Sequence, residues 1–268
     1  MLIKSHIKSL VKKNTTSLLN INRGGILENP IIVTLVEQLT SEQDGKIKSE
    51  LVTVDGSERV ATWIDISGAS NDASQSINLR KPIYTESIIN GHPTLDFDGT
   101  NDSLIGSSSL QSIPLADHTL FFAMRLGSPS PSEIECLSNW NDSGGDVDSE
   151  LYCFDSTGKF RLLGTIGTED LITDNLKNTN FIISIAVDHG NTIVTRLNGV
   201  QKSSFSINAV NDAPDSYVIC AELDTGSSTG NFLDAQLGEK LMYTSRLSDP
   251  DILSVNQYLS TKFGIPLD

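Results

Sequence analysis

The sequence predicts an all-β protein, a two-sheet antiparallel jelly-roll sandwich with a short C-terminal helix and an N-terminal extension. Two observations predict this class. Short apolar segments recur between turns rich in Gly, Asn and Asp, which is the spacing of a β-sandwich. The dipeptide Asn198-Gly199 lies between two such segments and is typical of a type I′ hairpin. We expect a basic arm over residues 1–46 and the sandwich over residues 47–268.

The beginning of the chain differs from the rest because apolar and basic side chains follow each other there at helical spacing. This pattern predicts a basic amphipathic helix or a flexible arm that docks on a partner. The docking residues would be Lys4, Ile7, Lys8, Leu10, Val11 and Lys12. The lysines interrupt any apolar run, and no small-residue cleavage site follows, so we expect no secretory signal peptide.

The strands are expected in order along the chain. The apolar run at residues 31–36 fits a strand or a short helix, since its period decides neither. A turn is expected at residues 42–45, and a hairpin turn at residues 55–56. The expected strands are Leu51–Val54, Val60–Ile66, Pro82–Tyr84, Thr94–Phe97, His118–Arg125, Ser132–Asn139, Leu151–Phe154, Lys159–Leu163, Phe181–Asp188, Thr192–Leu197, Gln201–Phe205, Tyr217–Ala221 and Ala235–Tyr243.

One amphipathic helix is expected at the C-terminal end, over residues 247–263. Ser248 is placed as its N-cap, Pro250 suits the first turn, and Gly264 follows as the C-cap. The residues that would share its apolar face are Ile252, Val255, Leu259 and Phe263.

Charge and cysteine content restrict the function classes. The chain has a net charge of −15, and the acidic excess lies in residues 61–268. A body this acidic repels phosphate backbones, so nucleic acid is not expected as a partner. The cysteines are Cys136, Cys153 and Cys220. An odd number cannot be fully paired, so we expect free buried thiols, with one bridge plus a spare thiol as the alternative.

Residues 58–104 contain two Asx/Gly-rich turns, at Asp65–Asp72 and Asp98–Asp102, and resemble the concanavalin A-like lectin/glucanase superfamily in its laminin-G-like form. The matching residues are Trp63, Asp65, Ser67, Gly68, Asn71, Asp72, Ala73, Gln75, Asn90, Gly91, Pro93, Leu95, Phe97, Asp98, Gly99, Asn101 and Asp102. The C-terminal helix also resembles the ending of microbial and viral members. From the residues themselves, we expect the aspartates of both turns to form Asx turns that hold strand ends.

The segment Asp146-Val-Asp148-Ser-Glu150 has three possible interpretations. Glycanases of this fold carry a Glu-x-Asp-x-Glu strand, but the shorter Asp146 at the first position and the lack of an aromatic platform argue against catalysis here. A second interpretation is a calcium site, with hard oxygen ligands from Asp142, Asp146, Asp148 and Glu150. The third is a solvated acidic loop.

A carbohydrate site needs an aromatic face and a few placed polar groups. Trp63 alternates with apolar neighbours along a strand and is expected in the core. Trp140, Asn141 and Asp142 are therefore the predicted sugar-binding residues. The four histidines have no metal-like spacing.

These observations lead to a non-enzymatic protein as the expected function. By analogy with the viral members of the family, we expect a virion structural protein of a tailed phage, a capsid decoration or fibre-type protein. Its arm would anchor it to other virion proteins, and its sandwich would point outward, with a host surface glycan as its candidate ligand. The protein would be made in the host cytoplasm and would belong to an oligomer or larger assembly. The alternative is an extracellular carbohydrate-binding lectin module, with calcium as its one candidate cofactor.

Overall fold

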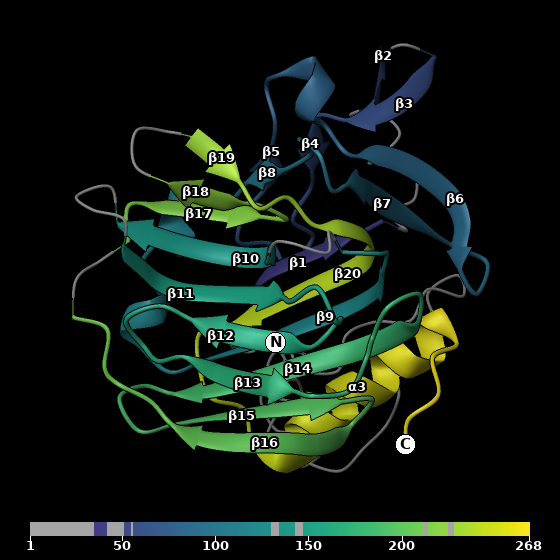
Figure 1. Ribbon diagram of the computed structural model, residues 1–268. Helices are drawn as coiled ribbons and strands as arrows, with labels where there is room; N and C mark the ends of the chain where they lie inside the picture. Colours follow the sequence, from purple (N-terminus) through teal and green to yellow (C-terminus); the bar gives the residue numbers. More distant parts are fainter. Residues whose placement is uncertain are drawn as a thin grey trace, which may run out of the picture.

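The computed structural model describes residues 35–41, 51–54, 56–129, 134–142, 147–211, 214–224 and 228–268. Two antiparallel sheets face each other across one main core, and the C-terminal helix covers the outer face of the larger sheet (Figure 1). The predicted all-β sandwich with a C-terminal helix is therefore confirmed. The predicted docking residues between Lys4 and Lys12 lie outside the described residues.

The larger sheet has the strand order β16-β15-β14-β9-β20-β7-β6-β3-β2, and β1 pairs with β20 beside this path. Its strands are β1 (Leu35–Thr40), β2 (Leu51–Val54), β3 (Ser57–Val60), β6 (Ile83–Ile89), β7 (His92–Asp98), β9 (His118–Leu126), β14 (Asn180–Asp188), β15 (Thr192–Leu197), β16 (Val200–Ser206) and β20 (Asp234–Tyr243).

The smaller sheet has the order β13-β12-β11-β10-β17-β8-β5-β4. Its strands are β4 (Thr62–Trp63), β5 (Ala73–Ser74), β8 (Leu104–Ile105), β10 (Glu135–Asp142), β11 (Val147–Phe154), β12 (Phe160–Leu163), β13 (Glu169–Ile172) and β17 (Ser216–Ile219). A separate pair, β18 (Glu222–Asp224) and β19 (Ser228–Gly230), lies beside β10 and β17. Three short 3-10 turns are η1 (Asn78–Arg80), η2 (Ser108–Leu110) and η3 (Ile113–Leu115).

The central strands β9 and β14 are buried on both faces, which explains why their sequences are apolar almost throughout. In β9, Leu120, Phe122 and Met124 face the core between the sheets. Phe121 and Ala123 face the helix instead. Successive side chains of a strand point to opposite faces, so a strand covered on both sides has no polar alternation.

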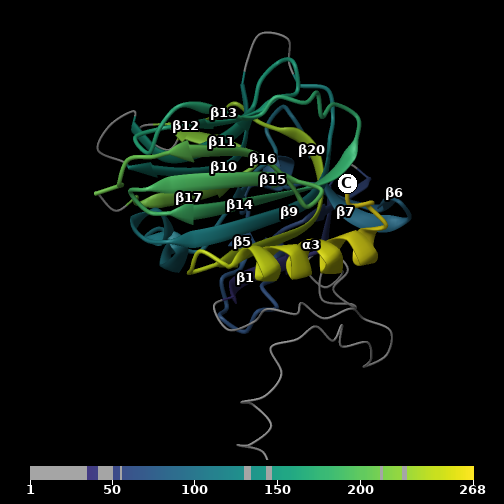
Figure 2. The same cartoon turned by 90° about the horizontal axis from the view of Figure 1, so that it is seen from below.

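Helix α3 (Asp249–Phe263) begins and ends as the sequence predicts. Ser248 Oγ accepts a hydrogen bond from the Asp251 N–H (3.4 Å), and Gly264 has the left-handed φ of 61° expected of a C-cap. Asn90 Nδ2 donates to the carbonyl oxygens of the last helical residue and of Gly264, each at 3.0 Å. Figure 2 shows the helix lying along the larger sheet. Among the described residues, no helix is both long and apolar enough to cross a bilayer.

The approach of α3 to the sheet depends on Gly238. A β-carbon at this position would lie 2.6 Å from Phe263 Cε1, closer than real β-carbons come to other atoms. Gly238 is also the extra residue at a β-bulge, where the register of β20 shifts between Leu237 and Glu239. A residue without a side chain therefore lets the helix pack directly on β20.

Strand β1 falls inside the predicted arm, yet it is part of the larger sheet. Its residues pair with β20 from Leu35 opposite Tyr243 to Thr40 opposite Glu239. Its polar side chains are buried on both sides of the strand, with Glu37 fully buried. The larger sheet therefore includes β1, which lies within the residues 1–46 that were expected to form the arm.

Candidate functional site

Asp148 and Glu150, two of the four predicted calcium ligands, lie on β11, and a bulge interrupts this strand. Glu150 lies opposite Trp140, while Asp148 lies opposite Asn141, so Ser149 is an extra residue without a partner. Regular alternation would place Asp148 and Glu150 on the same face. The bulge places them on opposite faces of the smaller sheet.

Glu150 faces the core between the sheets, where its carboxylate binds a histidine. Glu150 Oε2 lies 3.1 Å from His118 Nε2 and accepts a hydrogen bond from the Tyr152 hydroxyl at 3.2 Å. His118 Nδ1 is also 2.9 Å from the carbonyl oxygen of Ala116, so each ring nitrogen faces an acceptor. Burial disfavours the charged imidazole, but the Glu150 carboxylate outweighs this effect and the pKa of His118 is raised. The geometry is that of a buried ion pair with no exposed surface.

Asp148 lies on the outer face, where it helps to fasten β18. Asn139 Nδ2 donates to Asp148 Oδ1 at 2.6 Å, and Asn139 Oδ1 accepts from the Leu223 N–H at 3.2 Å. Asn141 Nδ2 donates to the Leu223 carbonyl oxygen. These side chains form bonds within the fold, so this face of β10 and β11 lies under the β18–β19 pair.

The predicted calcium site is not assembled in the described part of the chain. Asp146 lies outside the described residues, as does the side chain of Asp142. The other two predicted ligands, Asp148 and Glu150, cannot share one ion across the sheet. Within the described ranges, no three His, Cys, Asp or Glu side chains are grouped so that they could hold a metal.

The predicted sugar-stacking role of Trp140 does not fit its position. Trp140 is fully buried, and its ring stacks on Tyr217 with centroids 4.4 Å apart. Its Nε1 donates to the carbonyl oxygen of Leu110 at 3.0 Å. A sugar ring cannot reach an indole face that is covered by another ring. Asn141 is also buried, and Trp63 lies in the core as predicted.

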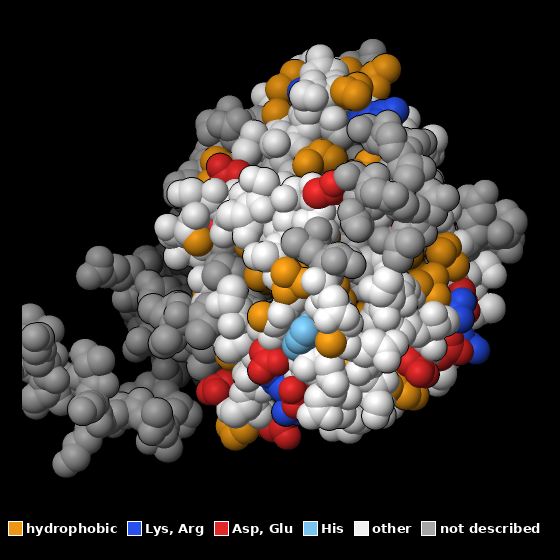
Figure 3. Space-filling view, turned by 90° about the vertical axis from the view of Figure 1, so that its left-hand side faces the viewer, with side chains coloured by type: hydrophobic (Ala, Val, Ile, Leu, Met, Phe, Trp, Pro, Cys, Tyr) orange, Lys and Arg blue, Asp and Glu red, His pale blue; other side chains and the backbone are white. Residues whose placement is uncertain are grey.

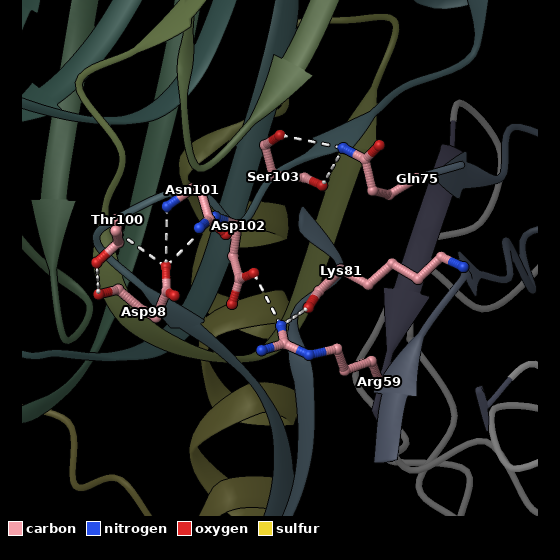
Figure 4. Close-up of polar contacts among 8 residues, drawn as sticks. All are labelled: Arg59, Gln75, Lys81, Asp98, Thr100, Asn101, Asp102 and Ser103. Atoms are coloured by element: carbon pink, nitrogen blue, oxygen red, sulfur yellow. Dashed lines mark hydrogen bonds and ion pairs between the residues drawn. The ribbon is translucent and has the colours of Figure 1, made fainter. Parts of the chain in front are cut away.

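The Asx turns predicted around Asp65 and Asp98 are both formed. Asp65 accepts hydrogen bonds from the backbone N–H groups of Gln38, Ser67 and Asn71, and it thereby holds β1 to the segment after β4. Asp98 Oδ1 accepts from the backbone N–H groups of the turn that follows it, at 2.8, 3.1 and 3.3 Å (Figure 4). These aspartates hold strand ends, as the residues predicted.

In the second turn, the buried carboxyl group of Asp102 also faces the guanidinium group of Arg59. Arg59 Nη1 of β3 lies 3.1 Å from Asp102 Oδ1, and the same nitrogen donates to the Lys81 carbonyl oxygen (Figure 4). Asp102 is fully buried. Burial and then repulsion from Asp98 raise the pKa of Asp102 to about 7, although Arg59 opposes the shift. The group is therefore a pH-sensitive link between β3 and the end of β7.

One further buried ion pair joins β1 to β20, and another joins α3 to β20 beside it. Glu37 binds Lys240 on the core side of β20. On the helix side, Lys262 Nζ of α3 lies 2.6 Å from Glu239 Oε2. Gln38 Nε2 donates to Glu239 Oε1 at 2.7 Å. No local sequence pattern marks these contacts of β1, because Glu37 and Lys240, like Gln38 and Glu239, are about two hundred residues apart in the chain.

The surface has no concentrated basic field on the side drawn in Figure 3. There, acidic side chains occur in several small groups among uncharged atoms, and lysine and arginine side chains are few. This distribution agrees with the net charge of −15.

Comparisons with known proteins show the fold alone. No family model matches the sequence, and no curated protein matches it. Among solved structures, the receptor binding domain of botulinum neurotoxin C/D mosaic serotype is similar, with a TM-score of 0.59 and 13% identity over 85% of this chain and 52% of that one. The Trypanosoma rangeli sialidase in complex with sialic acid has a TM-score of 0.61 and 15% identity over 99% of this chain and 38% of that one.

This chain therefore spans about half or less of the length of these similar structures. Both an enzyme and a binding domain are among them, so the fold does not decide between catalysis and recognition. The class that the structure defines is an all-β sandwich of two antiparallel sheets.

Proposed function

We propose that this chain is a non-enzymatic recognition or decoration protein. The observation that carries the proposal is the separation of Asp148 and Glu150 by the bulge at Ser149. Most glycoside hydrolases use two carboxyl groups on either side of one scissile bond, roughly 5 to 10 Å apart and open to the substrate. Here one carboxylate is an ion-pair partner inside the core, and the other binds Asn139 on the outer face.

The form of the proposal that the sequence favours is a virion structural protein of a tailed phage. The basic amphipathic pattern of residues 1–24 supports an anchor to other virion proteins, and the resemblance of Trp63–Asp102 to laminin-G-like domains supports an outward lectin-like body. Deletion of residues 1–24 should then abolish incorporation into the particle, whereas the thermal unfolding of the sandwich stays unchanged. A matched full-length variant with Lys4, Lys8 and Lys12 changed to Gln tests whether incorporation depends on the positive charge of the arm or on its length. Normal incorporation of the deleted protein would rule out the anchor.

The second candidate is a carbohydrate-binding lectin module that acts outside the cell. The specific observation in its favour is the similarity to a receptor binding domain and to a sialidase solved with sialic acid. Saturable binding on a glycan array would support it. Because Trp140 is buried and Glu150 faces the core, such binding should survive a calcium chelator. Loss of binding on chelation would restore the calcium hypothesis.

A further inference from the structure

We propose that Cys136 and Cys153 form a reversible disulfide, and that Cys220 stays a free thiol. The three cysteines are the whole complement of the chain, and all of them are reduced and buried in this structure. Cys136 of β10 lies directly opposite Cys153 of β11. Both belong to one small cluster on the outer face of the smaller sheet. Cys220 belongs to the main core on the other side of that sheet.

The backbone geometry of the pair suits a bridge. The Cys136 N–H donates to the Asn231 carbonyl oxygen at 2.8 Å, so the cysteines are not a pair that exchanges both backbone hydrogen bonds. Directly opposite residues of the non-hydrogen-bonded type have α-carbons about 4.5 Å apart and side chains at their closest. A disulfide needs α-carbons roughly 4.4 to 6.8 Å apart. The bond can therefore form without moving either strand far.

The surroundings make the two thiols unequal. Burial raises the pKa of Cys153 to about 12, although the Arg161 cation on β12 opposes the shift. Burial raises the pKa of Cys136 well above its usual value, and the neighbouring Cys153 and Glu222 add to this shift, whereas the Arg161 cation lies directly opposite Cys153 on β12. The thiolate is the nucleophile in exchange, so Cys153 attacks first.

The reaction is thiol–disulfide exchange with a small disulfide such as oxidised glutathione. The Cys153 thiolate attacks one sulfur of the oxidant, forms a mixed disulfide and expels one glutathione thiolate. Cys136 then attacks the Cys153 sulfur and expels the second. Two protein thiols are oxidised, one disulfide is reduced to two thiols, and the released thiolates take up the two protons. The Cys136–Cys153 disulfide joins β10 to β11 at the end of the strand pair that is opposite to residues 143–146.

Because both thiols are fully buried, with Cys136 bound to Glu222 and to the Asn231 carbonyl oxygen, the test includes refolding. The full-length protein is refolded from denaturant in a glutathione redox buffer, and a native sample is incubated in the same buffer. Free thiols are then counted in denaturant, and peptides are mapped by mass spectrometry. We expect one free thiol, at Cys220, a mass lower by two hydrogen atoms and a Cys136–Cys153 cross-linked peptide. The midpoint of thermal unfolding should rise by roughly 5 to 10 °C and fall back with reductant.

The variants provide the controls. Cys220→Ser should keep the cross-link, whereas Cys153→Ser should lose both the cross-link and the response to reductant. Cys136→Ser should trap glutathione on Cys153. Three free thiols after both treatments, or a cross-link that includes Cys220, would overturn the proposal.

Discussion

Asp148 and Glu150 are two residues apart on β11, yet their carboxylates lie on opposite faces of the smaller sheet. One inserted residue, Ser149, causes this separation. The sequence pattern is typical of a glycanase strand, but both carboxylates make structural contacts. Glu150 forms an ion pair in the core, and Asp148 binds Asn139, which holds β18. Each role predicts a different response to mutation.

Glu150→Gln should destabilise the protein by about 3 kcal/mol at pH 6, because it leaves the buried His118 imidazolium without its counter-charge. The folded pKa of His118 is raised, so its stabilisation is complete below its unfolded pKa of about 6.5 and is lost as pH rises through the folded value. Urea unfolding from pH 5.5 to 9 should show this decline in the wild type and not in the variant. Asp148→Asn is the matched control and should keep the decline. A decline with pH that persists in Glu150→Gln would show that the Glu150–His118 pair is not ionised.

Asp102→Asn should change stability in a lower pH window. The folded pKa of Asp102 is about 7, above its usual value of 3.8, so the folded state holds a proton that the unfolded chain has lost between these values. The contribution of Asp102 to the free energy of unfolding therefore falls as pH rises from about 4 to about 7. Chemical denaturation between pH 4 and 7.5 should show a smaller fall for Asp102→Asn than for the wild type. Equal slopes would mean that Arg59 keeps Asp102 ionised in the fold.

Gly238→Ala should cost about 1 to 3 kcal/mol, because the added methyl group would meet the Phe263 ring. Equilibrium unfolding of Gly238→Ala, Phe263→Leu and the double variant forms a cycle. Leu at 263 relieves the contact, so the double variant should be more stable than the sum of the single changes predicts. Strict additivity would show that α3 does not press on β20 at this point.

Strand β1 should be essential to the sandwich, whereas the chain before it should not. Removal of residues 1–24 keeps the Glu37–Lys240 ion pair of β1, but removal of residues 1–41 leaves the buried Lys240 without Glu37. Loss of one member of a buried ion pair costs roughly 3 to 5 kcal/mol. Circular dichroism and thermal unfolding should therefore show a cooperative fold in the first truncation and none in the second. A stably folded 42–268 fragment would place β1 outside the body.

The sequence was enough to predict the sandwich because its signals are local. Turn residues such as Asn198-Gly199 have the positive φ values that the pattern implies, and the Ser248 and Gly264 caps delimit α3. The short strands β5, β8, β13, β18 and β19 were not predicted, since strands of two to four residues carry too little periodicity.

The site was less predictable because it depends on contacts between distant segments. No local pattern marks Ser149 as a bulge, since its position follows from pairing with β10. Trp140 reads as a surface residue among Asn and Asp, but Tyr217 from another strand covers its ring. The polar sequence of β1 resembles an exposed segment, and only Lys240 and Glu239 at the other end of the chain explain its burial.

The most direct test of a recognition role compares binding with turnover on one panel of glycans. The full-length protein is incubated with immobilised glycans, and mass spectrometry measures both the bound protein and any released sugar. We predict saturable binding to a narrow set of glycans or to none, with no released sugar in either case. Release of sugar by the wild type that disappears in Glu150→Gln would contradict this, because it would require Glu150 to reach a substrate from inside the core.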